Sequence, residues 1–228
     1  MDKHLSRKTM VGKAGRKFIE DILRIIFNQN IQGDFVQCGV WRGGIAGLML
    51  DHILKSEIDL TKSTRKLWLY DTFEGMPPPG ENDPSKANDY YLQTKNIDNE
   101  FSNWCNASIE DVIETLKYVS QDYDYYTKLI QGKVEETLLD EKNLPSKIAL
   151  LHLDTDWYSS TKIELEILYP LIADEGFLIV DDYQQVFGSE NGWEGCTQAV
   201  DEYFKDRPTP LQNFEHDKIL VLQKRNIL

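Results

Sequence analysis

Paired aspartates stand at the ends of two apolar segments of this chain. They are Asp154 and Asp156 in LHLDTDWYSST, and Asp181 and Asp182 in GFLIVDDYQ. Apolar runs of this length, bounded by glycine or turn residues, are typical of strands buried on both faces. The stretch between them predicts a helix, so the two strands form a βαβ unit and should be parallel neighbours. All four carboxylates then lie at the carboxyl edge of the sheet, where open α/β folds bind ligands.

Carboxylates gathered at one sheet edge repel one another. Neighbouring strands lie ~4.8 Å apart, and two unit charges about 5 Å apart repel by about 3 kcal/mol at an effective dielectric constant of about 20. A positive group among them would offset this repulsion. A hard divalent cation is the simplest candidate, because carboxylate oxygens are its preferred ligands.

Short apolar strands alternate with helices along the 228 residues, which predicts one domain (1–228) with a parallel sheet and helices on both faces. The residues assign six strands, over the ranges 34–40, 66–73, 127–132, 148–154, 176–181 and 218–224. Helices are expected over 43–56, 108–120, 160–173 and 195–206, and within an N-terminal helical segment, 1–30. The helix at 108–120 opens with a capping-box pattern, Ser108 with Asp111.

The N-terminal segment is basic and then amphipathic. Its apolar residues fall on one helical face: Phe18, Ile19, Ile22, Ile25 and Ile26. Charged residues interrupt this run, so it does not fit the apolar core of a signal peptide. The pattern predicts a helix that packs on the domain or on a second subunit.

A glycine-rich turn, Gly39–Gly44, joins the first strand to the first helix. Glycine at this place lets a ligand approach the backbone and leaves helix N–H groups free. The spacing fits neither the dinucleotide fingerprint nor a P-loop, which disfavours an NAD(P) oxidoreductase. The second strand ends at Asp71, where nucleoside-binding α/β domains place an acid for ribose hydroxyls. Together, the turn, Asp71 and the acidic edge suggest a nucleoside-containing cofactor beside a cation site.

A polar, proline-rich stretch, 75–89, follows the second strand. It is too long for an ordinary strand-to-helix connection, and long loops in compact domains are usually lids, binding loops or linkers. We therefore expect an active-site flap over 75–107. Substrate choice should depend on this flap and on the N-terminal helix.

The composition excludes several partners. The net charge is −13 and the pI about 4.8, which argues against nucleic acid, since a phosphate backbone needs a basic face. The three cysteines are odd in number and lack CxxC spacing, so neither a disulfide framework nor a zinc site is expected, and a reducing cytoplasm fits. No stretch is long enough to span a membrane, so no membrane partner is expected. A homodimer is the candidate assembly.

Five motifs resemble, in order and spacing, the macrocin O-methyltransferase (TylF-like) family. They are DFVQCGVWRGG, LYDTFEGMPPP, LHLDTDWYSST, GFLIVDDY and WEGCTQAVDEYF, and the resemblance covers roughly residues 33–205. It implies the class I methyltransferase fold: a Rossmann-like, doubly wound, mostly parallel seven-stranded sheet with helices on both faces. It also implies methyl transfer from S-adenosylmethionine, dependent on Mg²⁺ or another divalent cation, to a sugar hydroxyl of a natural product.

The resemblance further implies roles for individual residues. The turn at Gly39–Gly44 would hold the methionine end of the cofactor, and Asp71 its ribose. The other implied cofactor contacts are Val40, Trp41, Arg42, Gly43 and Asp154, with Ser108 and Gly132–Glu135 near the adenine. The implied metal ligands are Asp154, Asp181 and Asp182. Asp156 matches the general base, and in extended chain its side chain would project on the same side as that of Asp154. Trp193, Gly195 and Asp201 match a late motif of structural role.

One departure and two alternatives remain open. Gln37-Cys38 stands where the family usually has an acid before the first glycine, so cofactor hydrogen bonding there differs. A catechol-type O-methyltransferase would use the same site, since vicinal phenols chelate Mg²⁺ equally well. A non-catalytic scaffold that binds S-adenosylmethionine would have no need of all four aspartates.

Overall fold

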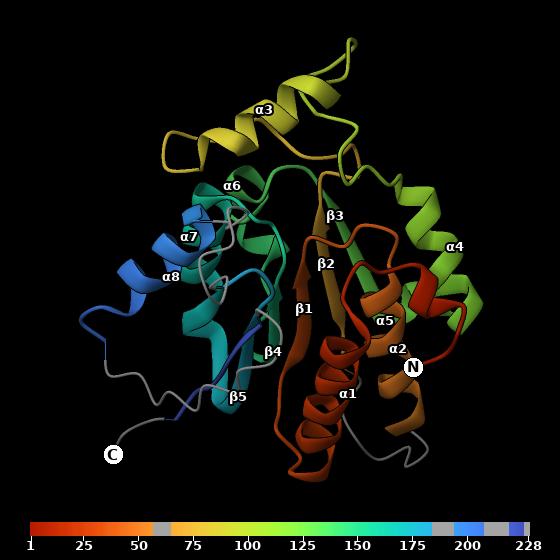
Figure 1. Cartoon of the computed structure of the whole chain (residues 1–228). Coiled ribbons are helices and arrows are strands. Elements are labelled where there is room, and N and C mark those ends of the chain that lie inside the picture. Colours follow the sequence, from red (N-terminus) through yellow and green to blue (C-terminus); the bar gives the residue numbers. More distant parts are fainter. Residues whose placement is uncertain (57–64, 184–193, 208–218, 226–228) are drawn as a thin grey trace.

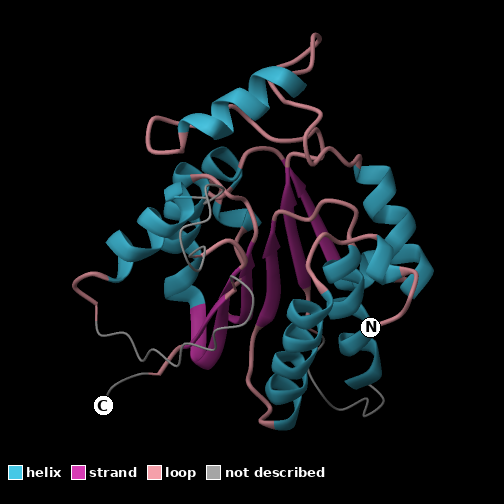
Figure 2. Ribbon diagram, in the orientation of Figure 1, coloured by secondary structure: helices cyan, strands magenta, loops and turns pink. Residues whose placement is uncertain are grey.

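The computed structural model describes residues 1–56, 65–183, 194–207 and 219–225. They form a central sheet between two layers of helices (Figures 1 and 2). The strands are β1 (Asp34–Cys38), β2 (Leu67–Asp71), β3 (Thr127–Gln131), β4 (Ile148–Leu153), β5 (Ile172–Val180) and β6 (Leu220–Gln223). Their order is β3-β2-β1-β4-β5-β6, and only β6 pairs antiparallel. The α/β fold with a mostly parallel sheet is therefore confirmed.

Six strands, rather than the expected seven, lie within the described residues. The last predicted strand, 218–224, appears as β6 at the edge beside β5. Residues 208–218, which precede it and would hold a hairpin partner, lie outside the described residues.

Helices of two groups cover the two faces of the sheet (Figure 1). One group is α1 (Lys13–Asn28), α2 (Gly44–Ser56), α4 (Ile109–Val119) and α5 (Tyr123–Tyr126). The other is α6 (Val134–Thr137), α7 (Tyr158–Leu168) and α8 (Glu194–Phe204). Successive side chains of β1 face opposite sides of the sheet. Phe35 packs with the first group of helices and Val36 with the second. This two-sided burial explains why the strands read as continuous apolar runs.

The register aligns the carboxyl ends of four strands. Cys38 of β1 pairs with Tyr70 of β2 and with Leu153 of β4, which pairs with Val180 of β5. The next residue after each of these strand positions therefore emerges at one edge: Gly39, Asp71, Asp154 and Asp181. The order of the sheet thus brings the glycine-rich turn and the acidic segments together.

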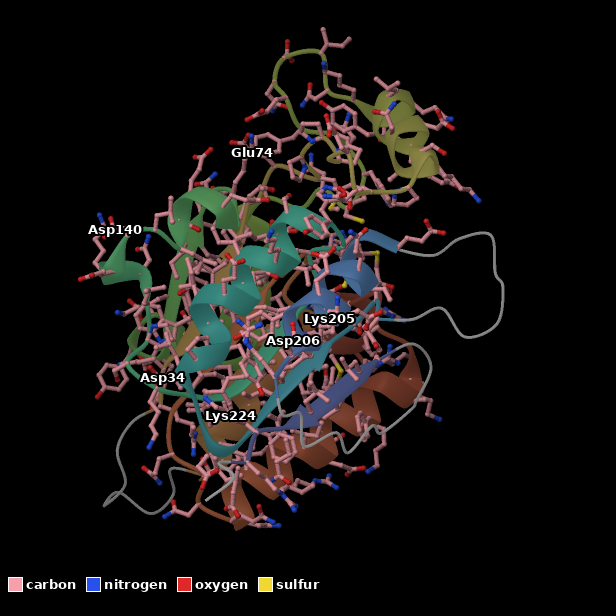
Figure 3. All side chains as sticks on the ribbon, turned by 90° about the vertical axis from the view of Figure 1, so that its left-hand side faces the viewer. Asp34, Glu74, Asp140, Lys205, Asp206 and Lys224 are labelled. Atoms are coloured by element: carbon pink, nitrogen blue, oxygen red, sulfur yellow. The ribbon has the colours of Figure 1, made fainter. Side chains whose placement is uncertain are left out.

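The helix between β4 and β5 is shorter than the predicted 160–173, and β5 begins at Ile172 rather than at 176. Pro170 has no N–H group to continue the helical ladder, so α7 ends in a short 3-10 turn, Tyr169–Leu171. The Lys224 ammonium, labelled in Figure 3, donates to the carbonyls of Pro170 and Ile172 and holds this corner (3.1 and 2.8 Å).

The region expected to be a polar loop contains a helix, α3 (Ser85–Thr94). Ala87 and Tyr91, four residues apart, are buried on one side of it, which explains how a polar segment docks as a helix. It lies above the carboxyl edge of the sheet, at the top of Figure 1.

Helix α1 packs through a face that differs by one residue from the predicted one. Ile19, Ile22, Leu23 and Ile26 are buried, whereas Ile25 is 38% exposed, so including Ile25 was wrong and Leu23 takes its place. The spacing i, i+3, i+4, i+7 is that of a single buried stripe. None of the described helices is both long and apolar enough to cross a bilayer.

Truncating Leu23 to alanine should lower the free energy of unfolding by about 2–5 kcal/mol, because its fully buried side chain leaves a cavity. Ile25→Ala, on the exposed side of the same helix, should cost less than about 1 kcal/mol. Urea unfolding followed by circular dichroism measures both. Equal losses for the two variants would contradict the docking of α1 by this face.

Candidate active site

Two adjoining cavities open at the carboxyl edge of the sheet. The glycine-turn cavity is lined by Gly39, Trp41, Asp71 and Gly132, among others. The acidic cavity is lined by Gln37, Val40, Trp104 and the four aspartates Asp154, Asp156, Asp181 and Asp182. Both cavities share Met10, Trp41, Cys105, Asp154 and Asp156. Asp154 and Asp156 therefore lie at the boundary between them.

Three of the four aspartates come together closely. Asp154, Asp156 and Asp182 each offer a carboxylate oxygen, and these oxygens lie within 4.8 Å of one another. Asp181 lines the same cavity, and its amide is held by the Leu153 carbonyl at 3.0 Å, but it does not belong to this close group. The predicted convergence is thus present, with Asp156 rather than Asp181 as its third member.

Asp156 reaches this group by a turn and not by extended chain. Its φ is +65°, in the left-handed region, and the Trp157 amide donates to the Thr155 carbonyl across it at 2.7 Å. The expectation of an extended Asp154–Asp156 segment was therefore wrong, because α7 begins at Tyr158 and the chain must reverse first. Aspartate is among the few residues that tolerate this conformation, which costs other residues about 1–2 kcal/mol.

The buried carboxyl group of Glu164 holds Thr155, which lies between Asp154 and Asp156. The Thr155 hydroxyl donates to both oxygens of Glu164, each at 3.1 Å. Glu164, on α7, is fully buried, and burial raises its pKa well above the usual range. The Cys38 thiol also hydrogen-bonds to Glu164, which links β1 to the same support. No sequence pattern marked Glu164, since a glutamate within a helix normally faces solvent.

Crowding alters the protonation of the acids. Burial raises the pKa of Asp154 well above its usual range, and the charges of Asp181 and Asp182 raise it further. Burial also raises the pKa of Asp156, helped by a hydrogen bond with Asp182. Without a cation, these groups therefore retain protons at pH values where an isolated aspartate would be ionised.

Asp71 braces the glycine-rich turn. One carboxylate oxygen accepts from the amides of Val40 and Trp41 at 2.6 and 3.1 Å, and the other accepts from Phe73 at 2.9 Å. The Gly44 amide is also taken, by the Lys8 carbonyl at 2.8 Å. The Gly39 and Gly43 amides donate to the carbonyls of Tyr70 and Val40, at 2.9 and 3.0 Å. The expectation that this turn leaves its N–H groups free was therefore wrong for five of its six residues. The ribose contact of Asp71 stays a prediction.

Gly39 is the glycine that the turn requires. Its φ is +79°, and a β-carbon there would overlap the carbonyl oxygen of Asp154. The Asp154 amide donates to the Cys38 carbonyl at 2.9 Å, so the two segments are in direct contact.

Several residues implied by the resemblance lie away from both cavities. Arg42 pairs with Asp111 on α4 at 3.6 Å, and the α-carbon of Gly43 faces the side of the same helix. Ser108 is exposed and caps α4 by accepting from the Asp111 amide at 3.3 Å, which confirms its predicted cap. Gly132 does line the glycine-turn cavity. Trp193 lies outside the described residues, while Asp201 accepts from the Tyr183 hydroxyl at 2.7 Å.

Gln37 lies at the acidic cavity in place of the family's usual acid. It is 2% exposed, and its side-chain amide donates to the Gly39 carbonyl at 2.9 Å. Its side-chain oxygen is buried and has no hydrogen-bond partner among the described residues.

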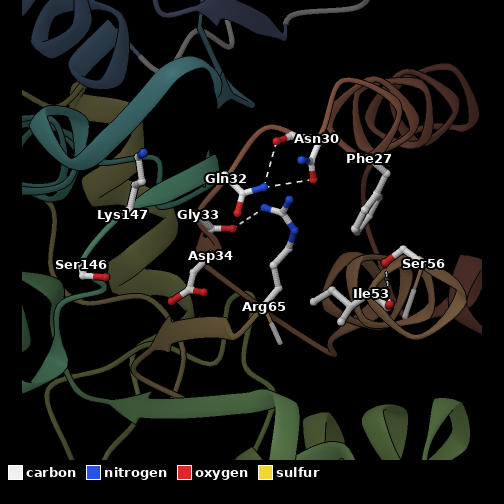
Figure 4. Close-up of a pocket in the computed structure, with 10 residues that line it drawn as sticks. All are labelled: Phe27, Asn30, Gln32, Gly33, Asp34, Ile53, Ser56, Arg65, Ser146 and Lys147. Atoms are coloured by element: carbon white, nitrogen blue, oxygen red, sulfur yellow. Dashed lines mark hydrogen bonds between the residues drawn. The ribbon is translucent and has the colours of Figure 1, made fainter. Parts of the chain in front are cut away.

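A third cavity lies at the opposite, amino end of the sheet (Figure 4). Arg65 donates there to the carbonyls of Ile31 and Gly33, and burial lowers its pKa to about 10. Asp34 accepts from the Lys66 amide and the Trp68 ring, at 3.0 and 2.9 Å. None of the predicted site residues lines this cavity.

Comparisons with known proteins show which proteins this chain resembles. The model of the macrocin O-methyltransferase (TylF) family matches residues 1–221. The chain is 29% identical over 196 residues to demethyldecarbamoylnovobiocin O-methyltransferase of Streptomyces niveus, covering 86% of this chain and 67% of that protein. It is 27% identical over 198 residues to 8-demethyl-8-(2,3-dimethoxy-alpha-L-rhamnosyl)-tetracenomycin-C 4'-O-methyltransferase of Streptomyces olivaceus, covering 86% and 67%. Among solved structures, the O-methyltransferase NovP superposes with a TM-score of 0.74 at 27% identity, covering 96% of this chain and 83% of that one.

Relieving the carboxylate crowding should stabilise the metal-free protein. With a chelator present, Asp182→Asn should raise the melting temperature by about 2–4 °C, the shift that about 1 kcal/mol gives in a protein of this size. Asp206→Asn, a change of the same charge at an exposed position (Figure 3), should leave it within about 1 °C. Differential scanning calorimetry measures both, and a lower melting temperature for Asp182→Asn would contradict the repulsion.

Proposed function

The chain belongs to the macrocin O-methyltransferase (TylF) family and is an S-adenosylmethionine-dependent O-methyltransferase, and we propose that it methylates a sugar hydroxyl of a glycosylated natural product. The observation that carries the proposal is the position of Asp154 and Asp156 on the boundary of the two cavities. A base at this boundary faces both a cofactor in the glycine-turn cavity and an acceptor in the acidic one. The related Streptomyces olivaceus enzyme, whose name includes a rhamnosyl group, supports a sugar acceptor.

The reaction needs alignment more than activation of the methyl donor. The acceptor oxygen attacks the methyl carbon, the carbon–sulfur bond breaks with its electron pair going to sulfur, and the hydroxyl proton must leave. We assign that proton to the carboxylate of Asp156. Asp156 can take the proton only in its carboxylate form, and a cation bound beside it would favour that charged form.

The donor set fits a hard divalent cation such as Mg²⁺. Asp154 and Asp182 each offer a carboxylate oxygen, these oxygens lie within 4.8 Å of each other, and carboxylate oxygens are the ligands that Mg²⁺ prefers. Asp154 and Asp182 would hold the ion, together with Asp181 from the same strand end. Such a cation, when bound, supplies Lewis-acid chemistry by lowering the pKa of a nearby hydroxyl.

The cofactor would lie along the glycine-rich turn. Gly39 permits close approach, Trp41 and Gly132 line the cavity, and Asp71 holds the turn in shape. Gln37 can offer its buried oxygen as a hydrogen-bond acceptor but carries no charge, unlike the usual acid.

Residues 75–107 would form a flap over the acceptor within a single domain. The Trp157 ring nitrogen donates to the Pro77 carbonyl at 3.1 Å, and Trp104 contacts Trp157 edge to face at 5.8 Å. The exposed Tyr90 ring lies next to Trp104, with the two ring centroids 5.6 Å apart. Trp104 and Met10 thus give the acidic cavity an apolar wall against which a ring could pack.

Asp156→Asn should lower kcat at least about 100-fold, because the amide cannot accept the proton. Calorimetric titration with S-adenosylhomocysteine should give an affinity within about twofold of the parent chain, since the turn at Gly39 is untouched. Turnover near the parent rate would remove Asp156 as the base.

Chelation should abolish turnover, and Mg²⁺ should restore it. The acceptor class is tested in the same assay, with a vicinal-diol glycoside and a simple catechol compared at equal concentration. We expect methylation of the glycoside with higher kcat/KM. Preference for the catechol would overturn the sugar assignment, and activity unchanged by chelator would overturn the metal.

A further inference from the structure

A carboxylate from the flap caps the helix that follows the catalytic segment. Asp83 accepts from the Tyr158 amide at 2.8 Å through one oxygen and from the Gly80 amide at 2.7 Å through the other. Tyr158 is the first residue of α7, and the N-cap residue Trp157 makes no side-chain cap of its own. The helix therefore receives its cap from a residue 75 positions earlier in the chain. A carboxylate at this end is also favoured by the helix dipole.

Gly195, at the start of α8, leaves the space that this carboxylate occupies. A β-carbon on Gly195 would overlap an Asp83 oxygen and would lie 3.1 Å from the Tyr158 nitrogen. The backbone at Gly195 needs no positive φ. Glycine is thus explained here by the proximity of the Asp83 carboxylate, which gives this residue of the late sequence motif a physical role.

The junction adjoins the strained turn of the catalytic segment. Asp156, in the left-handed conformation, lies two residues before Tyr158. The residues on either side of Asp156 are each held by a hydrogen bond. Thr155 donates to Glu164, and the Trp157 ring donates to the Pro77 carbonyl. Asp83 adds a hydrogen bond where the segment enters α7, so two flap residues, Pro77 and Asp83, hold it.

We infer that Asp83 is a positioning residue for Asp156: its carboxylate joins the flap to the start of α7 and holds the catalytic turn, and Gly195 keeps its place open. The geometry of the flap and that of the base are then coupled. This inference rests on the proposed function for its kinetic part only, because the hydrogen bond itself can be measured without turnover.

The first test is amide hydrogen exchange of the cofactor-free protein. Exchange at Tyr158 should become about fivefold faster or more in Asp83→Ala, the factor expected for a lost capping hydrogen bond. Gly195→Ala should have the same effect without any change in the flap sequence, because its methyl group displaces the carboxylate. Asp83→Asn keeps an acceptor and should retain the protection. Asp89→Ala, at an exposed position of α3, is the matched control and should match the parent chain.

The second test is kinetic. Asp83→Ala and Gly195→Ala should each lower kcat about tenfold or more with little change in cofactor affinity. Asp83→Asn should stay within about threefold, and the double variant Asp83→Ala with Gly195→Ala should be no worse than the poorer single one. Faster exchange with unchanged kcat, or additive losses in the double variant, would overturn the positioning role. Absence of methyl transfer by the parent chain would instead overturn the proposed function and leave the exchange result to decide the contact.

Discussion

Mutual repulsion among crowded, half-buried carboxylates is the constraint on which this site depends. The parallel register ends β4 and β5 at the same level, so the acids that come after them are held together by the sheet itself. Their oxygens lie within 4.8 Å in surroundings that raise the pKa of Asp154 and Asp156. A fold that keeps such a group stores unfavourable electrostatic energy, which a bound cation would release. The supports around the group are therefore as much a part of the site as the acids.

The cofactor turn and the acidic segment form one mechanical unit. Gly39 touches the Asp154 carbonyl, and the Asp154 amide bonds to Cys38. Asp71 ties β2 to the same turn through Val40 and Trp41. A movement of the glycine-rich turn would therefore disturb the acidic segment as well. This coupling suits methyl transfer, which needs the donor methyl group and the acceptor oxygen in line.

Strand ends and hydrophobic periodicity were predictable from the sequence because both are local signals. Apolar runs and their acidic termini predicted the parallel sheet and the positions of Asp154, Asp156 and Asp182 at its carboxyl edge. The left-handed turn at Asp156 could not be predicted, because it arises where the short connection between β4 and α7 reverses the direction of the chain. Contacts between distant segments, such as those of Lys8 with Gly44 and of Asp83 with Tyr158, depend on tertiary packing and leave no pattern in the chain. Leu23 and Ile25 show the limit of periodicity, since both fit an apolar stripe and only packing chooses between them.

The most direct measurement is anomalous scattering from a crystal soaked with Mn²⁺ and S-adenosylhomocysteine. We predict a single strong peak at the acidic cavity, within about 2.5 Å of carboxylate oxygens of Asp154 and Asp182. A crystal with ordered carboxylates and no peak there, or a peak bound by other residues, would contradict the account.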